Sequence, residues 1–279
     1  MNLIIQGSDI PTQSLKQLAK LTSASAIEAI SATAFRLVAA NETTRKEAAA
    51  FCESRSIDCG WVPAERRIRD FGLLVMDMDS TLITIECIDE IADMQGLKPQ
   101  VSAITESAMR GEIDFAESLR RRVSLLAGLD ESALQRVYDE RLQLSPGAEA
   151  LLAAAKDAGI KTLLVSGGFT FFTERLKPRL GLDYTAANTL EIIDGKLTGR
   201  VLGDIVDAQS KTDWLNRRRT ELSLAPSQVI AMGDGANDLK MMAAAGVSIA
   251  YHAKPVVRAQ ASHALNRMGL NGVIPLLGG

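Results

Sequence analysis

A pair of acids at the end of an apolar run is the first candidate for chemistry in this sequence. The stretch FGLLVMDMDSTL, residues 71–82, is mostly apolar until Asp77, and a second carboxylate follows at Asp79. A buried strand that ends in a polar turn would explain both residues, because Asp and Ser favour turns. A carboxylate can also act as a nucleophile or transfer a proton. The stretch alone leaves both interpretations open.

Two other apolar runs end in polar residues. One stops at Ser166, Gly167 and Gly168, and the other at the segment GDGAND, residues 233–238. In open α/β sheets, ligands bind outside the carboxyl ends of the strands, where the strand order reverses. We therefore expect the three strand ends to meet at one edge of a sheet, with Lys211 on a helix that packs nearby.

The elements around these residues predict the fold class. Apolar runs alternate with helical patterns over residues 71–85 and 145–279, which indicates an α/β fold with a doubly wound parallel sheet. Between them, residues 86–144 show helical patterns and no convincing strand, which predicts a helical cap insertion. Residues 1–65 predict a small N-terminal α/β domain, with strands at LIIQ, FRLVAA and DCGWV and helices at TQSLKQLAKLT and TRKEAAAFCESRS.

In combination, the motifs resemble those of the haloacid-dehalogenase-like phosphatase superfamily. They appear in the family's order, as DMDST at 77–81, VSGG at 165–168, Lys211, and GDGAND at 233–238. The insertion resembles that of phosphoserine phosphatases in the stretches DSTLITIECIDEIA and MRGEIDFAESLRRRVSLL. The resemblance implies hydrolysis of O-phospho-L-serine to L-serine and phosphate, the last step of serine biosynthesis.

The residues suit the chemistry that this resemblance implies. A phosphate monoester is a dianion, and two unit charges about 4 Å apart cost about 4 kcal/mol at an effective dielectric of 20, so an attacking carboxylate needs cations beside it. Asp77 and Asp234 can share a hard cation such as Mg²⁺, and Lys211 supplies a second positive charge. The Ser166 hydroxyl and neighbouring N–H groups can hold phosphate oxygens, and the glycines after it let the backbone approach closely.

The resemblance also implies individual roles. Asp77 attacks phosphorus to form an aspartyl-phosphate, and Asp79 protonates the departing alkoxide and then deprotonates water. One Mg²⁺ per active site is expected at Asp77, Asp79 and Asp234, with Asp79 contributing its backbone carbonyl. Asn237 is expected to steady the phosphoryl group, and Asp238 to complete or orient the metal shell.

Substrate selection is expected to rest on the insertion. Glu86 can meet the ammonium of phosphoserine, and Arg122 can pair with its carboxylate through two hydrogen bonds. Both would otherwise be ordinary surface charges. Met109 is expected in the core of the insertion as a supporting residue. Phe115 has the same expectation from its residue type, but the resemblance favours a place beside the substrate.

Composition excludes several classes of protein. The chain has 279 residues, 47% of them hydrophobic and 23% charged, with a formal net charge of −3. That balance gives no indication of nucleic-acid binding, and no apolar stretch has the length of a membrane span. The N-terminus lacks the features of a signal peptide. Cys52, Cys59 and Cys87 form no C-x-x-C pair, so reduced thiols and a cytoplasmic location are expected.

Some alternatives remain open from the sequence. The stretch after Asp77 is not an EF-hand loop, because Leu82 and Ile88 stand where that loop needs Gly and Glu. A phosphotransferase, or a phosphatase for a related small phosphomonoester, would use the same residues. A binding module centred on the N-terminal domain is a further alternative. The sequence leaves open the ligand of that domain, including regulatory serine, and the oligomeric state, including a homodimer.

Overall fold

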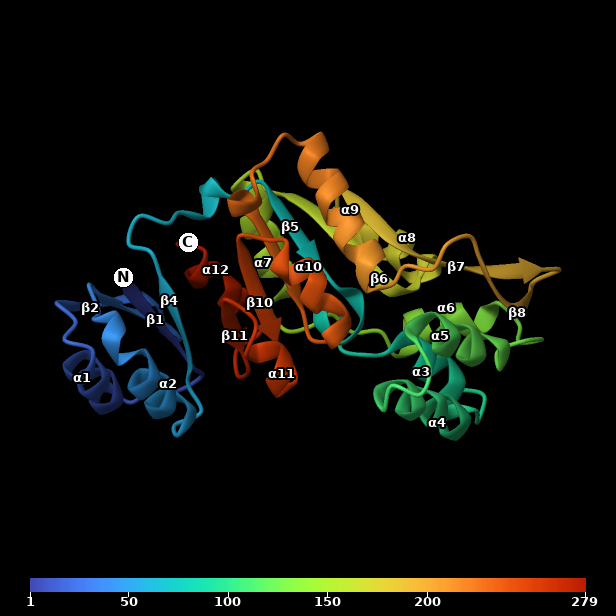
Figure 1. Cartoon of the computed structure of the whole chain (residues 1–279), viewed down its shortest axis with the longest axis horizontal. Helices are drawn as coiled ribbons and strands as arrows, with labels where there is room; N and C mark the ends of the chain where they lie inside the picture. Colours follow the sequence, from blue (N-terminus) through green and yellow to red (C-terminus); the bar gives the residue numbers. More distant parts are fainter.

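The computed structural model describes residues 1–279, which form two sheets (Figure 1). The smaller sheet is N-terminal and antiparallel, in the order β2-β3-β1-β4. Leu18 and Cys52 from its two helices pack with Leu3 and Ile5 of its central strand. The elements of this part are β1 (Asn2–Gln6), α1 (Thr12–Leu21), β2 (Ala26–Ser31), β3 (Ala34–Val38), α2 (Arg45–Glu53) and β4 (Asp58–Val62).

The strand β2 is the element of this N-terminal part that the sequence patterns did not predict. It lies at the edge of the sheet, and its residues AIEAIS are exposed along nearly the whole strand. Because no face of β2 is buried, its sequence carries no alternation of apolar and polar residues that matches its environment.

The larger sheet has seven strands in the order β11-β10-β9-β5-β6-β7-β8. Neighbouring strands are parallel from β11 to β7, and only the edge strand β8 runs antiparallel to its neighbour. This arrangement confirms the predicted α/β class. The strands are β5 (Leu73–Met76), β6 (Lys161–Phe169), β7 (Tyr184–Ile193), β8 (Lys196–Leu202), β9 (Val229–Gly233), β10 (Val247–Tyr251) and β11 (His263–Leu265).

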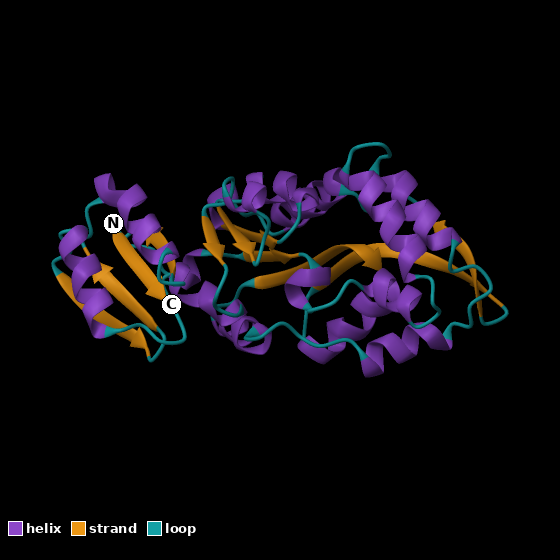
Figure 2. Cartoon of the chain, turned by 90° about the horizontal axis from the view of Figure 1, so that it is seen from below, coloured by secondary structure: helices purple, strands orange, loops and turns teal.

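Helices cover both faces of the larger sheet (Figure 2). Along β5, Leu74 and Met76 belong to the core that contains residues of α7 and α8, whereas Leu73 and Val75 belong to the core that contains residues of α9 and α10. A strand buried on both sides must be apolar at every position, which is why LLVM has no polar residue. The helices of this part are α7 (Ala148–Asp157), α8 (Thr170–Leu180), α9 (Ala208–Glu221), α10 (Leu239–Ala243), α11 (Pro255–Arg258) and α12 (Val273–Leu276).

The strand β6 differs from its expected length. It was expected to end before Ser166, but it extends to Phe169, which pairs with Asn188 of β7 after a shift of register. The irregular stretch between Val165 and Phe169 is therefore a bulge inside the strand. Bulges of this kind turn side chains toward a site at the end of a sheet.

The hairpin between β7 and β8 turns at Asp194 and Gly195. Asp194 and Gly195 have φ angles of +50° and +73°, which suit a two-residue turn between antiparallel strands. The hairpin also lies against the insertion, because a Cβ on Gly199 would come within 2.9 Å of the Cβ of Ala127.

Residues 86–144 contain the expected helices and lie beside the carboxyl end of the sheet (Figure 1). The chain leaves and re-enters the core at one place, where Ile83 and Leu144 form an isolated antiparallel bridge. The helices are α3 (Cys87–Asp93), α4 (Lys98–Met109), α5 (Phe115–Ser124) and α6 (Ser132–Glu140).

Buried polar contacts tie the N-terminal sheet to the core. The carboxylate of Asp58, at the start of β4, accepts hydrogen bonds of 2.9 Å from the backbone N–H groups of Asn266, Arg267 and Met268. Gly60 lies against the ring of His263 in β11, because a Cβ there would come within 2.9 Å of Nδ1. None of the helices in the structure has the length and apolar character needed to cross a membrane.

Candidate active site

Three neighbouring strands of the larger sheet, β9, β5 and β6, carry the polar motifs at their carboxyl ends. Asp77 directly follows β5, Asp234 directly follows β9, and Ser166 lies in the bulge of β6. The order of the sheet therefore brings together the three strand ends that the sequence predicted to meet.

Lys211 forms a buried ion-pair network with two carboxylates. Its Nζ lies 2.8 Å from Oδ2 of Asp77 and 2.7 Å from Oδ1 of Asp238, and all three side chains are buried. Burial opposes the charge of Lys211, but the two carboxylates raise its pKa above the usual value. The lysine therefore stays a cation against Asp77. It lies in the first turn of α9, which begins at Ala208.

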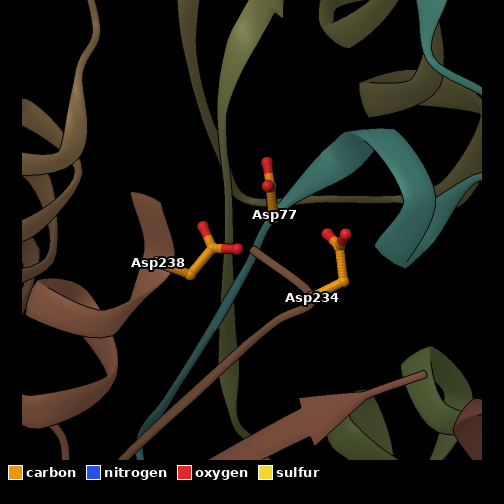
Figure 3. A group of neighbouring side chains, drawn as sticks. All are labelled: Asp77, Asp234 and Asp238. Carbon is orange, nitrogen blue, oxygen red and sulfur yellow. The ribbon is translucent and has the colours of Figure 1, made fainter. Parts of the chain in front are cut away.

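The carboxylates of Asp77, Asp234 and Asp238 lie close enough together that they could hold a metal ion. Their ligand atoms all lie within 4.8 Å of one another, and the three carboxylates surround one small volume (Figure 3). Burial and the charge of Asp238 raise the pKa of Asp77, against the opposing effect of Lys211, and they raise that of Asp234 to about 6. A bound cation would relieve this concentration of negative charge. Oxygen ligands without Cys or His suit a hard divalent ion.

The side chain of Asp79 points away from this group of carboxylates and contacts the insertion. Its Oδ1 accepts a hydrogen bond of 2.9 Å from the backbone N–H of Cys87, and its Oδ2 accepts one of 3.3 Å from Oγ of Ser166. Burial raises the pKa of Asp79, and both hydrogen bonds oppose that rise. A Cβ on Gly168 would lie 2.6 Å from Oδ2 of Asp79, so only glycine leaves room for this carboxylate.

The bulge of β6 presents small groups to the site. The Ser166 hydroxyl accepts a hydrogen bond of 2.8 Å from the N–H of Gly168. Asn188, buried in β7, donates to the carbonyl of Gly167 at 2.8 Å and accepts from the N–H of Val206 at 2.8 Å. Asn188 thus holds the bulge in place. Nothing in the local pattern of its sequence distinguishes it.

A cavity of about 650 Å³ opens between these strand ends and the insertion. Most of the predicted site residues line it, whereas Ser166, Lys211 and Asp238 lie buried behind its wall. The predicted residues on the wall are Asp77, Asp79, Glu86, Met109, Phe115, Arg122, Gly167, Gly168, Asp234 and Asn237.

Glu86 and Arg122 reach this cavity from the insertion. Oε1 of Glu86 accepts a hydrogen bond of 2.7 Å from Ser80, whose φ of +55° is unusual for a residue other than glycine. Burial and the charge of Asp79 raise the pKa of Glu86 to about 8. Burial lowers the pKa of Arg122, while Asp89 and Glu86 act against that shift. Asp89 also lines the cavity and was not predicted.

Two apolar residues of the insertion differ in their placement. Met109 was expected in the core, and that expectation is wrong: it is 66% exposed and lines the cavity. It is the last residue of α4, so its side chain lies beyond the packed part of that helix. Phe115 is half-buried at the start of α5 and touches the core, because a Cβ on Gly167 would come within 2.8 Å of its Cζ.

The GDGAND motif folds back on itself. Asp238 accepts a hydrogen bond of 3.0 Å from the N–H of Gly235, and a Cβ on Gly233 would lie 2.2 Å from its Oδ2. Asn237 lines the cavity beside Asp234. Thr81, which was not predicted, donates to Oδ1 of Asp234 at 3.2 Å and so links two of the motifs.

The comparison with family models identifies the class of protein. A model described as haloacid dehalogenase-like hydrolase matches residues 74–243, and one described as a domain of unknown function matches residues 3–47. The chain belongs to the haloacid dehalogenase-like hydrolase family. This confirms the resemblance that the four motifs indicated.

Relatives within this family are phosphoserine phosphatases by name. The one from Polaromonas sp. is 56% identical over 216 residues, which are 76% of this chain and 92% of the relative. The solved structure of a probable phosphoserine phosphatase from Vibrio cholerae, in its unliganded form, is 40% identical in sequence and has a TM-score of 0.87. The match covers 99% of this chain and 86% of the Vibrio chain. A substrate-bound phosphoserine phosphatase is 36% identical with a TM-score of 0.69, over 74% of this chain and 97% of its own.

Proposed function

We propose that this chain hydrolyses O-phospho-L-serine to L-serine and phosphate, through a phosphoryl group held covalently on Asp77. One observation carries the proposal: a single cavity is lined by Asp77 and Asp79 from the core and by Glu86 and Arg122 from the insertion. Such a cavity offers groups for the chemistry on one side and charges for an amino acid on the other. The names of the relatives support the choice of substrate.

In the first half of the reaction, a carboxylate oxygen of Asp77 attacks phosphorus and the bond from phosphorus to the serine oxygen breaks. Asp79 gives its proton to that oxygen as serine leaves. The buried environment that raises the pKa of Asp79 favours the protonated form needed for this step. Lys211, 2.8 Å from Asp77, keeps positive charge beside the nucleophile as the dianion arrives.

In the second half, water attacks the phosphorus of the aspartyl-phosphate. Asp79 takes a proton from that water, and the bond between phosphorus and the Asp77 oxygen breaks to release phosphate. We propose that Ser166 and the N–H groups of the bulge hold phosphate oxygens in both halves. Asn237 is proposed to steady the same oxygens from the other side of the cavity.

A hard divalent cation fits the carboxylate group, and we propose Mg²⁺, one per site. Asp77 and Asp234 would hold it, together with the backbone carbonyl of Asp79, and it would neutralise charge on the phosphate oxygens. Asp238 was expected to complete or orient the metal shell. We propose instead that it orients Lys211, because its carboxylate is already bonded to Nζ of that lysine and to the N–H of Gly235.

We also propose a division of the chain. Residues 71–85 and 145–279 form the catalytic core, residues 86–144 the cap that supplies Glu86 and Arg122, and residues 1–65 a separate small domain. The antiparallel sheet within residues 1–65 has its own apolar cluster, which supports treating it as a unit.

A panel of phosphomonoesters tests the proposal. Phosphoserine, phosphoethanolamine and p-nitrophenyl phosphate would be offered to the full chain with Mg²⁺, and phosphate release would be followed with and without an amino alcohol as acceptor. We expect phosphoserine to have the highest kcat/KM, chelation to abolish turnover, and Mg²⁺ to restore it. Transfer of phosphate to the acceptor in place of release would favour the phosphotransferase alternative. Turnover that survives exhaustive chelation would contradict the metal assignment.

A further inference from the structure

A fourth strand end reaches the active-site cavity. The strand β10 lies next to β9 in the sheet and ends at Tyr251, so the residues after it fall at the same edge as Asp234. Among them, Lys254 is exposed and lines the cavity. The motifs of the sequence do not include this residue.

The backbone around Lys254 is held in place. His252 has a φ of +45°, its N–H donates to the carbonyl of Leu265 at 2.7 Å, and its Nε2 lies 3.1 Å from the carbonyl oxygen of Met268. The carbonyl of Lys254 accepts hydrogen bonds of 2.9 and 3.1 Å from Val257 and Arg258, at the start of α11. These backbone hydrogen bonds fix the position of the Lys254 Cα, so that any movement of the ammonium comes from the side chain.

The ammonium of Lys254 is an exposed, unpaired cation on the wall of the cavity. Lys211 is buried and already paired with two carboxylates, and Arg122 is half-buried. Lys254 is exposed, and no carboxylate lies within 4.0 Å of its Nζ. The wall otherwise carries more acidic than basic side chains, which would repel an incoming anion.

Lys254 also lies where the core meets the insertion. Its Nζ is 4.0 Å from Sδ of Met109, the exposed last residue of α4. A flexible stem at this junction lets the charge point outward to solvent or inward to a bound anion.

We propose that Lys254 is a substrate-capture residue: its unpaired ammonium attracts the anionic phosphomonoester into the cavity and contributes to binding, but takes no part in bond breaking. The inference rests on the proposed function, because phosphoserine carries a net charge near −2 at neutral pH. It adds a binding residue from the core to those that the cap supplies.

Substitutions of Lys254 by residues of similar length, with and without a positive charge, test this role. Lys254→Met keeps the stem and its contact with Met109, and Lys254→Arg keeps the charge. The control is Lys156→Met, an exposed lysine on α7, away from the cavity lining. At an ionic strength of about 0.02 M, we expect kcat/KM of Lys254→Met for phosphoserine to fall about 5-fold through a higher KM, with kcat within about 2-fold of wild type. Lys254→Arg and Lys156→Met should stay within about 2-fold in both parameters.

Salt dependence separates capture from a structural role. At about 1 M ionic strength the Debye length is about 3 Å, so the deficit of Lys254→Met should shrink to less than about 2-fold. An unchanged kcat/KM of Lys254→Met at low salt would overturn the inference. A lower kcat, together with a loss of kcat/KM that stays the same at high salt, would also overturn it. Wild-type turnover of phosphoserine is measured in the same series, so failure of the proposed function would appear there and not in the comparison of variants.

Discussion

Asp79 and Cys87 join the two sides of the active site, because the backbone N–H of Cys87 donates to Oδ1 of Asp79 at 2.9 Å. Cys87 begins α3, the first helix of the insertion, and the first N–H groups of a helix have no partner within it. The carboxylate proposed to move protons thus satisfies one of these groups. Any movement of α3 relative to the core would change the environment of Asp79 together with the position of Glu86.

The first prediction concerns the nucleophile. Asp77→Asn should lower kcat/KM on phosphoserine by about 10⁴-fold or more, because an amide cannot form the phosphoryl intermediate. The fold should survive, since Lys211 keeps its contact of 2.7 Å with Asp238. Thermal unfolding and phosphate release measure both properties. The control Asp157→Asn, an exposed acid at the end of α7, should retain activity. Substantial turnover by Asp77→Asn, with mass spectrometry excluding deamidation, would refute the assignment.

The second prediction concerns recognition of the substrate carboxylate. Arg122→Ala should lower kcat/KM on phosphoserine by about ten- to a hundred-fold, which corresponds to the loss of about 1.5–3 kcal/mol from a charged hydrogen bond. Phosphoethanolamine has no carboxylate, so its poor turnover should hardly change. The matched control is Arg121→Ala on the same helix, where the side chain is 54% exposed and pairs with Glu117. Equal losses on both substrates would show that Arg122 does not read the carboxylate.

The third prediction concerns Gly168, the glycine beside the proposed proton-transfer residue Asp79. In Gly168→Ala the new Cβ would lie 2.6 Å from Oδ2 of Asp79 and 3.0 Å from Oγ of Ser166, so one of these groups must move. A displacement of about 1 Å in an active site can cost about 10²-fold, and we expect kcat to fall by about that factor. Gly7→Ala, where the Cβ meets a flexible Ile10 side chain at 3.1 Å, is the control. Wild-type kcat in Gly168→Ala would mean that Asp79 does not need its present position.

The fourth prediction concerns stability and pH. Burial, with Arg66 nearby, lowers the pKa of His263 from 6.5 to about 4. The unfolded chain therefore binds a proton below about pH 6.5 that the folded chain takes up only near pH 4. The neutral His263 ring contributes about 3 kcal/mol to the free energy of unfolding. This contribution is fully present above pH 6.5 and is lost as the pH falls toward 4.

Urea unfolding at pH 7, 6 and 5 measures this effect. His263→Gln should reduce the loss of unfolding free energy between pH 7 and 5, because the titrating group is gone. His252→Asn leaves His263 in place and should keep the wild-type dependence, and Asn tolerates the positive φ of that position. The same dependence on pH in His263→Gln and wild type would assign it to other groups.

Much of the candidate site follows from the sequence alone. Asp77, Ser166 and Asp234 each stand at the end of an apolar run, and that pattern is local to a few residues. Parallel strands end at a common edge of the sheet, so the convergence of these three residues follows from the alternation of strands and helices. The helical patterns of residues 86–144 likewise predicted the helices of the insertion.

Only the tertiary structure decided which side chains meet across the chain. Asn188 holds the carbonyl of Gly167, Thr81 bonds to Asp234, and Lys254 lies beside Met109. Each of these contacts joins different elements, and it depends on the order of the strands and the packing of helices on them. Periodicity states which face a residue occupies and where a strand stops, but it carries no information about the partner that a distant segment brings to that face. For that reason the motifs located the candidate reacting groups, whereas the residues that position them and the exposed lysine at the cavity emerged only from the fold.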